Sequence, residues 1–161
     1  MKNGFVLIGI IAGLIVGGVA LYIASYLWLL PYFHNQNLKE FSEQLVIIPP
    51  PAKTQEIDKL NQIGQQSGNG DHCDYLSALL LKTDIPKPEV EKYYSDNYKG
   101  KSRLYFFWIN EPHKPGIGNV NPTNIFTLDE WVNNKSKTTG ANLIIYIFEG
   151  AMTSAIDYRC G

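Results

Sequence analysis

The chain has 161 residues, and its 14 Lys and Arg against 15 Asp and Glu give a formal net charge of −1. No basic run is present, so we expect the protein to bind neither nucleic acid nor anionic lipid through charge. After an apolar N-terminal segment, the remaining length suits one domain rather than several.

An apolar run without formal charge extends from Phe5 to Leu30. As a helix rising about 1.5 Å per residue it reaches roughly 39 Å, more than the ~30 Å hydrocarbon core of a bilayer. A cleavable secretory signal has a shorter apolar region and a small-x-small cleavage site, whereas this run ends in Trp28-Leu29-Leu30. A core helix of a small soluble domain is rarely apolar over such a length. We therefore predict an uncleaved transmembrane anchor over residues 1–31.

Charges on either side of the anchor predict its direction. Lys2 and the N-terminal amine precede the run, and no charge follows it until Lys39. The positive-inside rule then places the N-terminus in the cytoplasm and the C-terminal domain in the periplasm or outside the cell. Pro31 is expected to end or kink the regular helix. Four aromatic side chains near that proline are typical of the outer membrane interface: Tyr26, Trp28, Tyr32 and Phe33.

Small side chains recur along the anchor with the spacing of one helix face. Another helix can approach such a face closely, so the pattern predicts a packing face for a homo- or hetero-oligomer within the lipid bilayer. The alternative interpretation is that glycine is simply frequent in membrane helices. The predicted helix-packing face consists of Gly9, Gly13, Gly17, Ala20 and Ala24.

Residues 32–51 are predicted to connect the anchor to the folded domain. A helical spacing of apolar residues indicates a short juxtamembrane helix at their start. The three consecutive prolines Pro49–Pro51 exclude a helix and favour a stiff, extended connector. We expect the extracytoplasmic domain to follow as residues 52–161.

In this domain the patterns predict the order β-β-α-β-α-β-β. Residues 54–66 are ambiguous between helix and strand, but Gly68-Asn69-Gly70 favours a hairpin to a strand at 72–82, because glycine accepts positive φ. That second strand is apolar on both faces from Leu76 onward, which is typical of a strand inside a sheet.

The second half of the domain alternates helices and strands. Two helices are predicted, one from residue 88 or 89 up to Gly100 and one from the capping box at Thr127 toward Asn134. The strands indicated here are 102–109, 141–148 and, after a turn at Glu149-Gly150, 153–160. These elements predict an α+β domain with a mostly antiparallel sheet and two helices on one face.

The chain has two cysteines, Cys73 and Cys160. In an oxidising compartment a lone pair in a small domain most often forms a disulfide, so we predict this bridge. It ties the C-terminus to the middle of the fold and contributes at most about 4–5 kcal/mol through chain entropy. With the reverse topology, both side chains are cytosolic thiols.

The densest polar cluster surrounds Cys73, and three interpretations apply to it. A thiol enzyme needs His72 or His113 as base, although neighbours on a strand point to opposite faces. A metal site has suitable carboxylate and imidazole ligands, but no recognised ligand spacing is present. The favoured interpretation is structural, a turn beside a bridged cysteine, with no metal and no cofactor. The cluster comprises Asn69, Asp71, His72, Asp74 and His113.

The start of the chain, from Lys2 to Gly9, resembles a type IV prepilin leader, with a short basic lead, a Gly4-Phe5 junction and a long apolar helix. The resemblance implies cleavage after Gly4, an outer α+β domain with a disulfide, and helical packing of subunits. The family normally has glutamate at the fifth mature position, where this chain has Gly9.

The segment Gly68–Tyr75, Gly-Asn-Gly-Asp-His-Cys-Asp-Tyr, resembles uncharacterised bacterial envelope proteins that carry such a core after a signal or anchor. This resemblance implies a location in the cell envelope, and it does not specify an activity. The sequence thus predicts a single-pass membrane-anchored extracytoplasmic protein that binds or scaffolds a partner. The alternatives are a type IV pilin-like assembly subunit and a thiol- or metal-dependent envelope enzyme.

Overall fold

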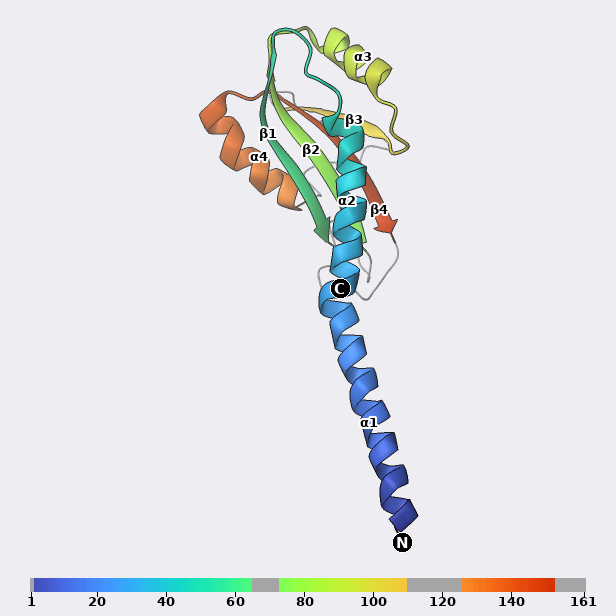
Figure 1. The fold of residues 1–161 in the computed structure, drawn as a ribbon. Helices are drawn as coiled ribbons and strands as arrows, with labels where there is room; N and C mark the ends of the chain where they lie inside the picture. Colours follow the sequence, from blue (N-terminus) through green and yellow to red (C-terminus); the bar gives the residue numbers. More distant parts are fainter. Residues whose placement is uncertain (1, 65–72, 110–125, 153–161) are drawn as a thin grey trace.

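The computed structural model describes residues 2–64, 73–109 and 126–152, and a long helix projects from a domain built on one sheet (Figure 1). The helical elements are α1 (Lys2–Ala24), the π-helix η1 (Ser25–Leu29), α2 (Leu30–Val46), α3 (Lys87–Asn97) and α4 (Phe126–Thr139). The strands are β1 (Thr54–Gly64), β2 (Cys73–Thr83), β3 (Leu104–Trp108) and β4 (Leu143–Met152). The α+β class predicted from the sequence is confirmed.

The elements α1, η1 and α2 form one uninterrupted helical rod (Figure 1). Pro31 lies inside this rod, although proline has no N–H to donate to the carbonyl four residues earlier. The turn before it is widened, and the Leu30 N–H donates to the Ser25 carbonyl five residues back. The helix therefore continues through Pro31. Of the two predictions for this proline, an end or a kink, the end is not observed, and the regular α-helix is interrupted by η1 just before it.

The second half of the rod, α2, belongs to the core of the domain. Phe41 and Leu45 are 4% and 0% exposed and share a buried cluster with residues of β2 and β4. The Tyr93 hydroxyl of α3 donates to the Pro49 carbonyl at 3.0 Å, which ties the proline segment to the domain as well. Residues 32–51 are therefore part of the folded domain rather than a separate connector. The apolar residues that indicated a juxtamembrane helix find their partner surface on the sheet.

The four strands form one antiparallel sheet in the order β1-β2-β4-β3. β1 and β2 pair as the predicted hairpin, with Thr54 opposite Thr83 and Gly64 opposite Asp74. The Gly-Asn-Gly turn expected between them lies outside the described residues.

β4 is longer than predicted. It continues through Glu149 and Gly150, where a turn was expected, and ends at Met152. The strand continues because it pairs with β2 over nearly its whole length. The last predicted strand, 153–160, lies outside the described residues.

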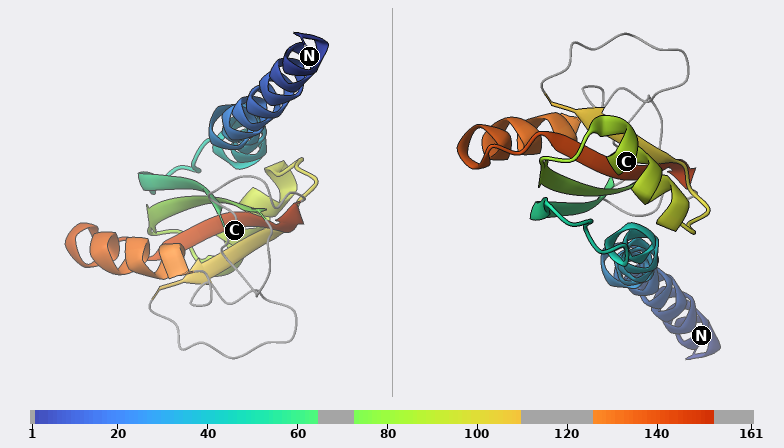
Figure 2. Two further views of the ribbon diagram at one scale, coloured as in Figure 1. Left: turned by 90° about the horizontal axis from the view of Figure 1, so that it is seen from below. Right: turned by 90° about the horizontal axis from the view of Figure 1, so that it is seen from above.

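The central strands β2 and β4 are buried on both faces of the sheet, and each face has its own helices (Figure 2). Successive residues of β2 point to opposite sides, so Leu79 packs with α2 and α3 whereas Leu80 packs with α4. Val90 of α3 and Leu128 of α4 accordingly belong to different buried clusters. The prediction that both helices share one face is wrong, because central strands that are apolar on both sides need cover on both sides.

The packing of α2 allows a direct test. Leu45→Ala removes a side chain that is 0% exposed, and it should lower the free energy of unfolding by about 2–5 kcal/mol. Ile47→Ala, at the end of the same helix, changes a side chain that is 79% exposed and should cost less than about 0.5 kcal/mol. Urea unfolding of the detergent-solubilised protein, followed by circular dichroism, measures both. Equal effects would show that α2 is not part of the core.

Candidate functional site

Within the described residues, α1 leaves the domain as an apolar helix on which nothing packs. Its large apolar side chains are exposed on several sides, among them Leu14 at 72%, Val16 at 68% and Leu21 at 72%. Such a helix requires an apolar environment, because the contact of this surface with water is unfavourable. Among the described residues, one helix, near the N-terminus, is long and apolar enough to cross a membrane.

The predicted helix-packing face lies on this exposed helix. In the described structure no atom beyond the neighbouring backbone of the helix itself comes within 4 Å of the position that a Cβ on Gly9, Gly13 or Gly17 would take. The space beside these glycines is therefore accessible to lipid or to another helix. Binding of a partner helix to this face stays a prediction.

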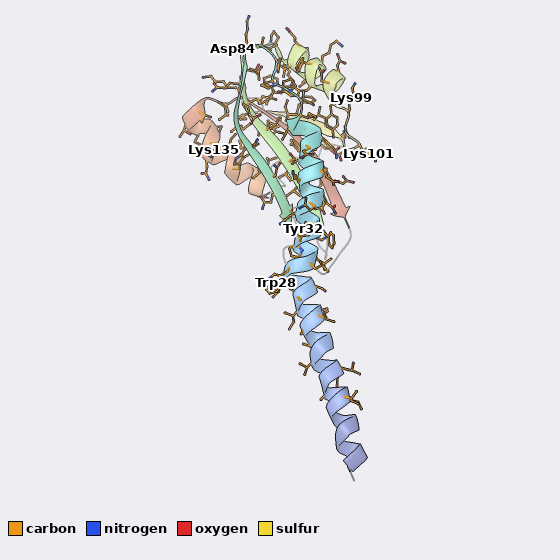
Figure 3. The ribbon with its side chains drawn as sticks, viewed as in Figure 1. Trp28, Tyr32, Asp84, Lys99, Lys101 and Lys135 are labelled. Atoms are coloured by element: carbon orange, nitrogen blue, oxygen red, sulfur yellow. The ribbon has the colours of Figure 1, made fainter. Side chains whose placement is uncertain are left out.

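The rod becomes two-faced where it enters the domain. Pro31 and His34 are buried on the side that meets the domain, whereas Trp28, Tyr32 and Phe33 remain 75%, 59% and 52% exposed. Figure 3 shows Trp28 and Tyr32 at this junction. We refer to Trp28, Tyr32 and Phe33 as the aromatic collar.

The junction also brings a histidine to Cys73. The His34 Nδ1 lies 3.7 Å from the Cys73 Sγ, and the His34 ring meets the Tyr75 ring edge-on at a centroid distance of 6.4 Å. His34 is 7% exposed and Cys73 is 0% exposed, so the contact is shielded from solvent. It fixes the start of α2 against the start of β2.

The pattern in the sequence pointed to other partners for Cys73, namely His72 and His113, and both lie outside the described residues. The contact of Cys73 with His34 was not predicted from the sequence. The missed signal was the position of His34, because His34 and Phe41 are seven residues apart and therefore share the helix face that the sheet covers.

Asp74 is the one member of the predicted polar cluster that the structure describes. Its side chain is 0% exposed, and its Oδ1 lies 3.2 Å from the position that a Cβ on Gly150 would take. The other members, Asn69, Asp71, His72 and His113, lie outside the described residues. No three His, Cys, Asp or Glu side chains come together as metal ligands within the described ranges. A metal or thiol site around Cys73 therefore stays a prediction.

A polar network joins α4 to the edge strand β1. The Asp58 carboxylate accepts a hydrogen bond from the Trp131 indole at 3.0 Å and pairs with the Lys135 ammonium at 3.1 Å. Burial opposes the ionisation of Asp58, but the hydrogen bonds from Lys135, Trp131 and the Lys59 backbone N–H, together with the charge of Lys135, hold the pKa of this carboxyl below its ordinary value. The register shift between Glu56 and Asp58 is a β-bulge, which re-aims side chains locally. The network is a structural link.

A shallow hollow of about 280 Å³ lies at the end of the domain far from α1, where Figure 3 labels Asp84. Ligand sites are usually enclosed and mainly apolar, and this surface is open and polar. It therefore does not indicate a small-molecule site. The hollow is lined by Lys53, Thr54, Gln55, Lys82 and Asp84.

Comparison of the chain with protein families, with curated proteins and with solved structures finds no match. The function must therefore be argued from the exposed helix, the junction and the two-sided sheet.

The Asp58 network predicts a pH-dependent contribution to stability. Asp58→Asn should lower the free energy of unfolding by about 1 kcal/mol at pH 7, because it removes a charged hydrogen-bond acceptor. The folded-state pKa is depressed, so the advantage of the wild-type protein is complete above the ordinary value of 3.8 and is lost as pH falls through the lower pKa of the folded state. Urea titrations at pH 7 and at acid pH measure the difference.

The matched control is Asp96→Asn, which removes the exposed pair of Asp96 with Lys92 and should change stability by less than about 0.5 kcal/mol. A difference between Asp58→Asn and the wild-type protein that persists unchanged in acid would contradict the prediction.

Proposed function

We propose that this chain is a single-pass membrane protein whose helix α1 spans the bilayer and whose α+β domain binds or scaffolds a partner on the outer side. The observation that carries the proposal is the unburied apolar helix, which runs without interruption into a core helix of the domain. The thin charge asymmetry around the anchor, with Lys2 on one side, supports a cytoplasmic N-terminus.

The continuity of α1 and α2 favours scaffolding over loose tethering. A flexible linker lets a domain sample many orientations, whereas a helix is stiff over such lengths. Phe41 and Leu45 hold α2 in the core, so the position of α1 in the membrane fixes which faces of the domain are presented. Such coupling suits a subunit that has to be placed relative to others.

The predicted disulfide between Cys73 and Cys160 is part of this proposal. Cys73 is 0% exposed, and the described part of the chain contains no free thiol, which supports a bridge formed in an oxidising compartment. Cys160 lies outside the described residues, so its partner is a proposal.

A type IV pilin-like assembly subunit is a second candidate. The specific observation in its favour is the rod, because a long apolar helix that leads into an α+β domain is what the resemblance at Lys2–Gly9 implies. The two candidates differ in one chemical fact, which is whether the peptide bond after Gly4 is cleaved.

The first test is the intact mass of the membrane-extracted protein, combined with alkaline carbonate washing. We expect a full-length mass and retention in the membrane pellet, because a spanning helix is not released by loss of charge contacts. A mass that lacks Met1–Gly4 would establish the pilin-like candidate instead. Release into the carbonate supernatant would contradict both.

The bridge has its own test. Cys73→Ser and Cys160→Ser should each lower the free energy of unfolding by about 2–4 kcal/mol, and the double variant should lose no more than either single variant, because both remove the same constraint. Reductant should bring the wild-type protein to the level of the variants. Additive losses, or a wild-type protein that is insensitive to reductant, would show that the two cysteines are not bridged.

A further inference from the structure

We infer that the base of the domain is a lipid-contacting surface: the aromatic collar lies in the head-group region, and the domain rests directly on the bilayer. The inference rests on the proposed membrane anchor and goes beyond it. An anchor alone is equally compatible with a domain that a stalk holds away from the lipid.

The rod below the collar is long enough to cross one membrane. The helix from Gly9 to Trp28 has about 20 residues, which span roughly 30 Å, the thickness of the hydrocarbon core. Trp28 then lies at the outer boundary of that core, and Phe33 lies about 7.5 Å beyond it, at the depth of the head groups. Indole and phenol rings are favoured at this depth, because their apolar bodies contact acyl chains while their polar atoms reach the head groups.

The exposure of the collar is the second argument. Trp28, Tyr32 and Phe33 are at least half exposed although the helix is already in contact with the domain at this level. The rings of Tyr32 and Phe33 lie against each other with centroids 5.8 Å apart, so they form one surface. Phe33 has no polar atom that water could satisfy, and a contiguous aromatic patch of this kind marks an interaction site.

The chain leaves no residues for a stalk. Pro31 is buried only three residues after Trp28, and His34 contacts Cys73 at the first residue of β2. The domain therefore begins where the collar is. A collar at the depth of the head groups places this end of the sheet at the membrane surface, while the hollow near Asp84 lies at the opposite end (Figures 1 and 3).

The chemistry of the collar specifies the kind of lipid contact. It contains no Lys or Arg, and the first charged residue after it is Lys39. Attraction to anionic head groups therefore contributes little, and the contact depends on aromatic side chains at the boundary between head groups and acyl chains. We expect the same depth in zwitterionic and in anionic vesicles.

The membrane depth of single tryptophans placed along the rod tests the inference. Full-length Trp28→Phe provides the background, and a single new tryptophan is added to it by Tyr22→Trp, Phe33→Trp or Ile47→Trp. These side chains are 65%, 52% and 79% exposed, so the fold should tolerate all three substitutions. Each protein is reconstituted in phosphatidylcholine vesicles with bromine at a shallow or a deep acyl position. Fluorescence of the background variant is subtracted, which removes the signals of Trp108 and Trp131.

The expected result is a graded pattern. Tryptophan at position 22 should be quenched most by deep bromine, and tryptophan at position 33, like native Trp28, most by shallow bromine. Position 47 lies about 21 Å further along the helix than position 33 and should be quenched only by aqueous iodide.

Three other outcomes would overturn the inference in distinguishable ways. If position 33 behaves like position 47 while position 22 is still quenched by bromine, the anchor stands and the domain is held off the bilayer. If position 33 is protected from both bromine and iodide, protein rather than lipid covers the collar, for example a second copy of the chain. If position 22 also escapes bromine and the protein is washed off by carbonate, the proposed anchor itself is wrong.

Discussion

The burial of one face of α2 against the sheet is the interaction on which the rest of the structure depends. Leu45 and Phe41 are enclosed by residues of β2, β4 and α3, so this helix cannot leave without opening the larger of the two cores. Because α2 is continuous with α1, the same contact joins the exposed apolar half of the rod to the domain. A domain attached in this way behaves as one body with its anchor.

The sheet accommodates this helix because its central strands are apolar on both sides. Ser77 is a small buried residue on the α2 side of β2, and its hydroxyl is satisfied by the Asn61 side chain at 2.8 Å. The opposite side is closed by α4 through Leu128 and Val132. The outer edge of β1 carries a bulge and charged residues, which are features that discourage pairing with another strand.

Local patterns predicted much of this fold, whereas the spatial arrangement required tertiary contacts. The apolar run, the hairpin pairing and the α+β class follow from composition and periodicity. The face of the sheet on which α4 packs does not follow from these patterns. Leu80 in β2 and Leu128 in α4 are in one buried cluster, but in the sequence they indicate only that each element has an apolar side. Gly140, with φ of 69°, ends α4 in the left-handed conformation, and this signal for a helix longer than predicted was present in the sequence.

The site was less predictable for the same reason. His34 and Cys73 are 39 residues apart, and nothing local to either residue indicates that they meet. Their contact follows only once α2 is known to lie on β2. The same dependence explains why the helix does not end at Pro31. Proline forbids one hydrogen bond, and the chain accommodates that loss by widening a single turn, because ending the helix would give up the contacts that α2 makes with the sheet.

The widened turn η1 changes the direction in which the predicted helix-packing face of α1 points relative to the domain. Ala24 belongs to the predicted helix-packing face, and Pro31 belongs to the face of the rod that meets the domain. The two residues are seven positions apart, so in a regular helix these two faces would point nearly the same way. The wider η1 turn acts as one inserted residue, and each residue of an α-helix turns the chain by about 100°. The two faces are therefore separated by roughly a third of a turn. Trp28 and Tyr32 follow Ala24 at intervals of four residues, so a helix bound along the predicted helix-packing face would extend toward the collar and compete with lipid for it.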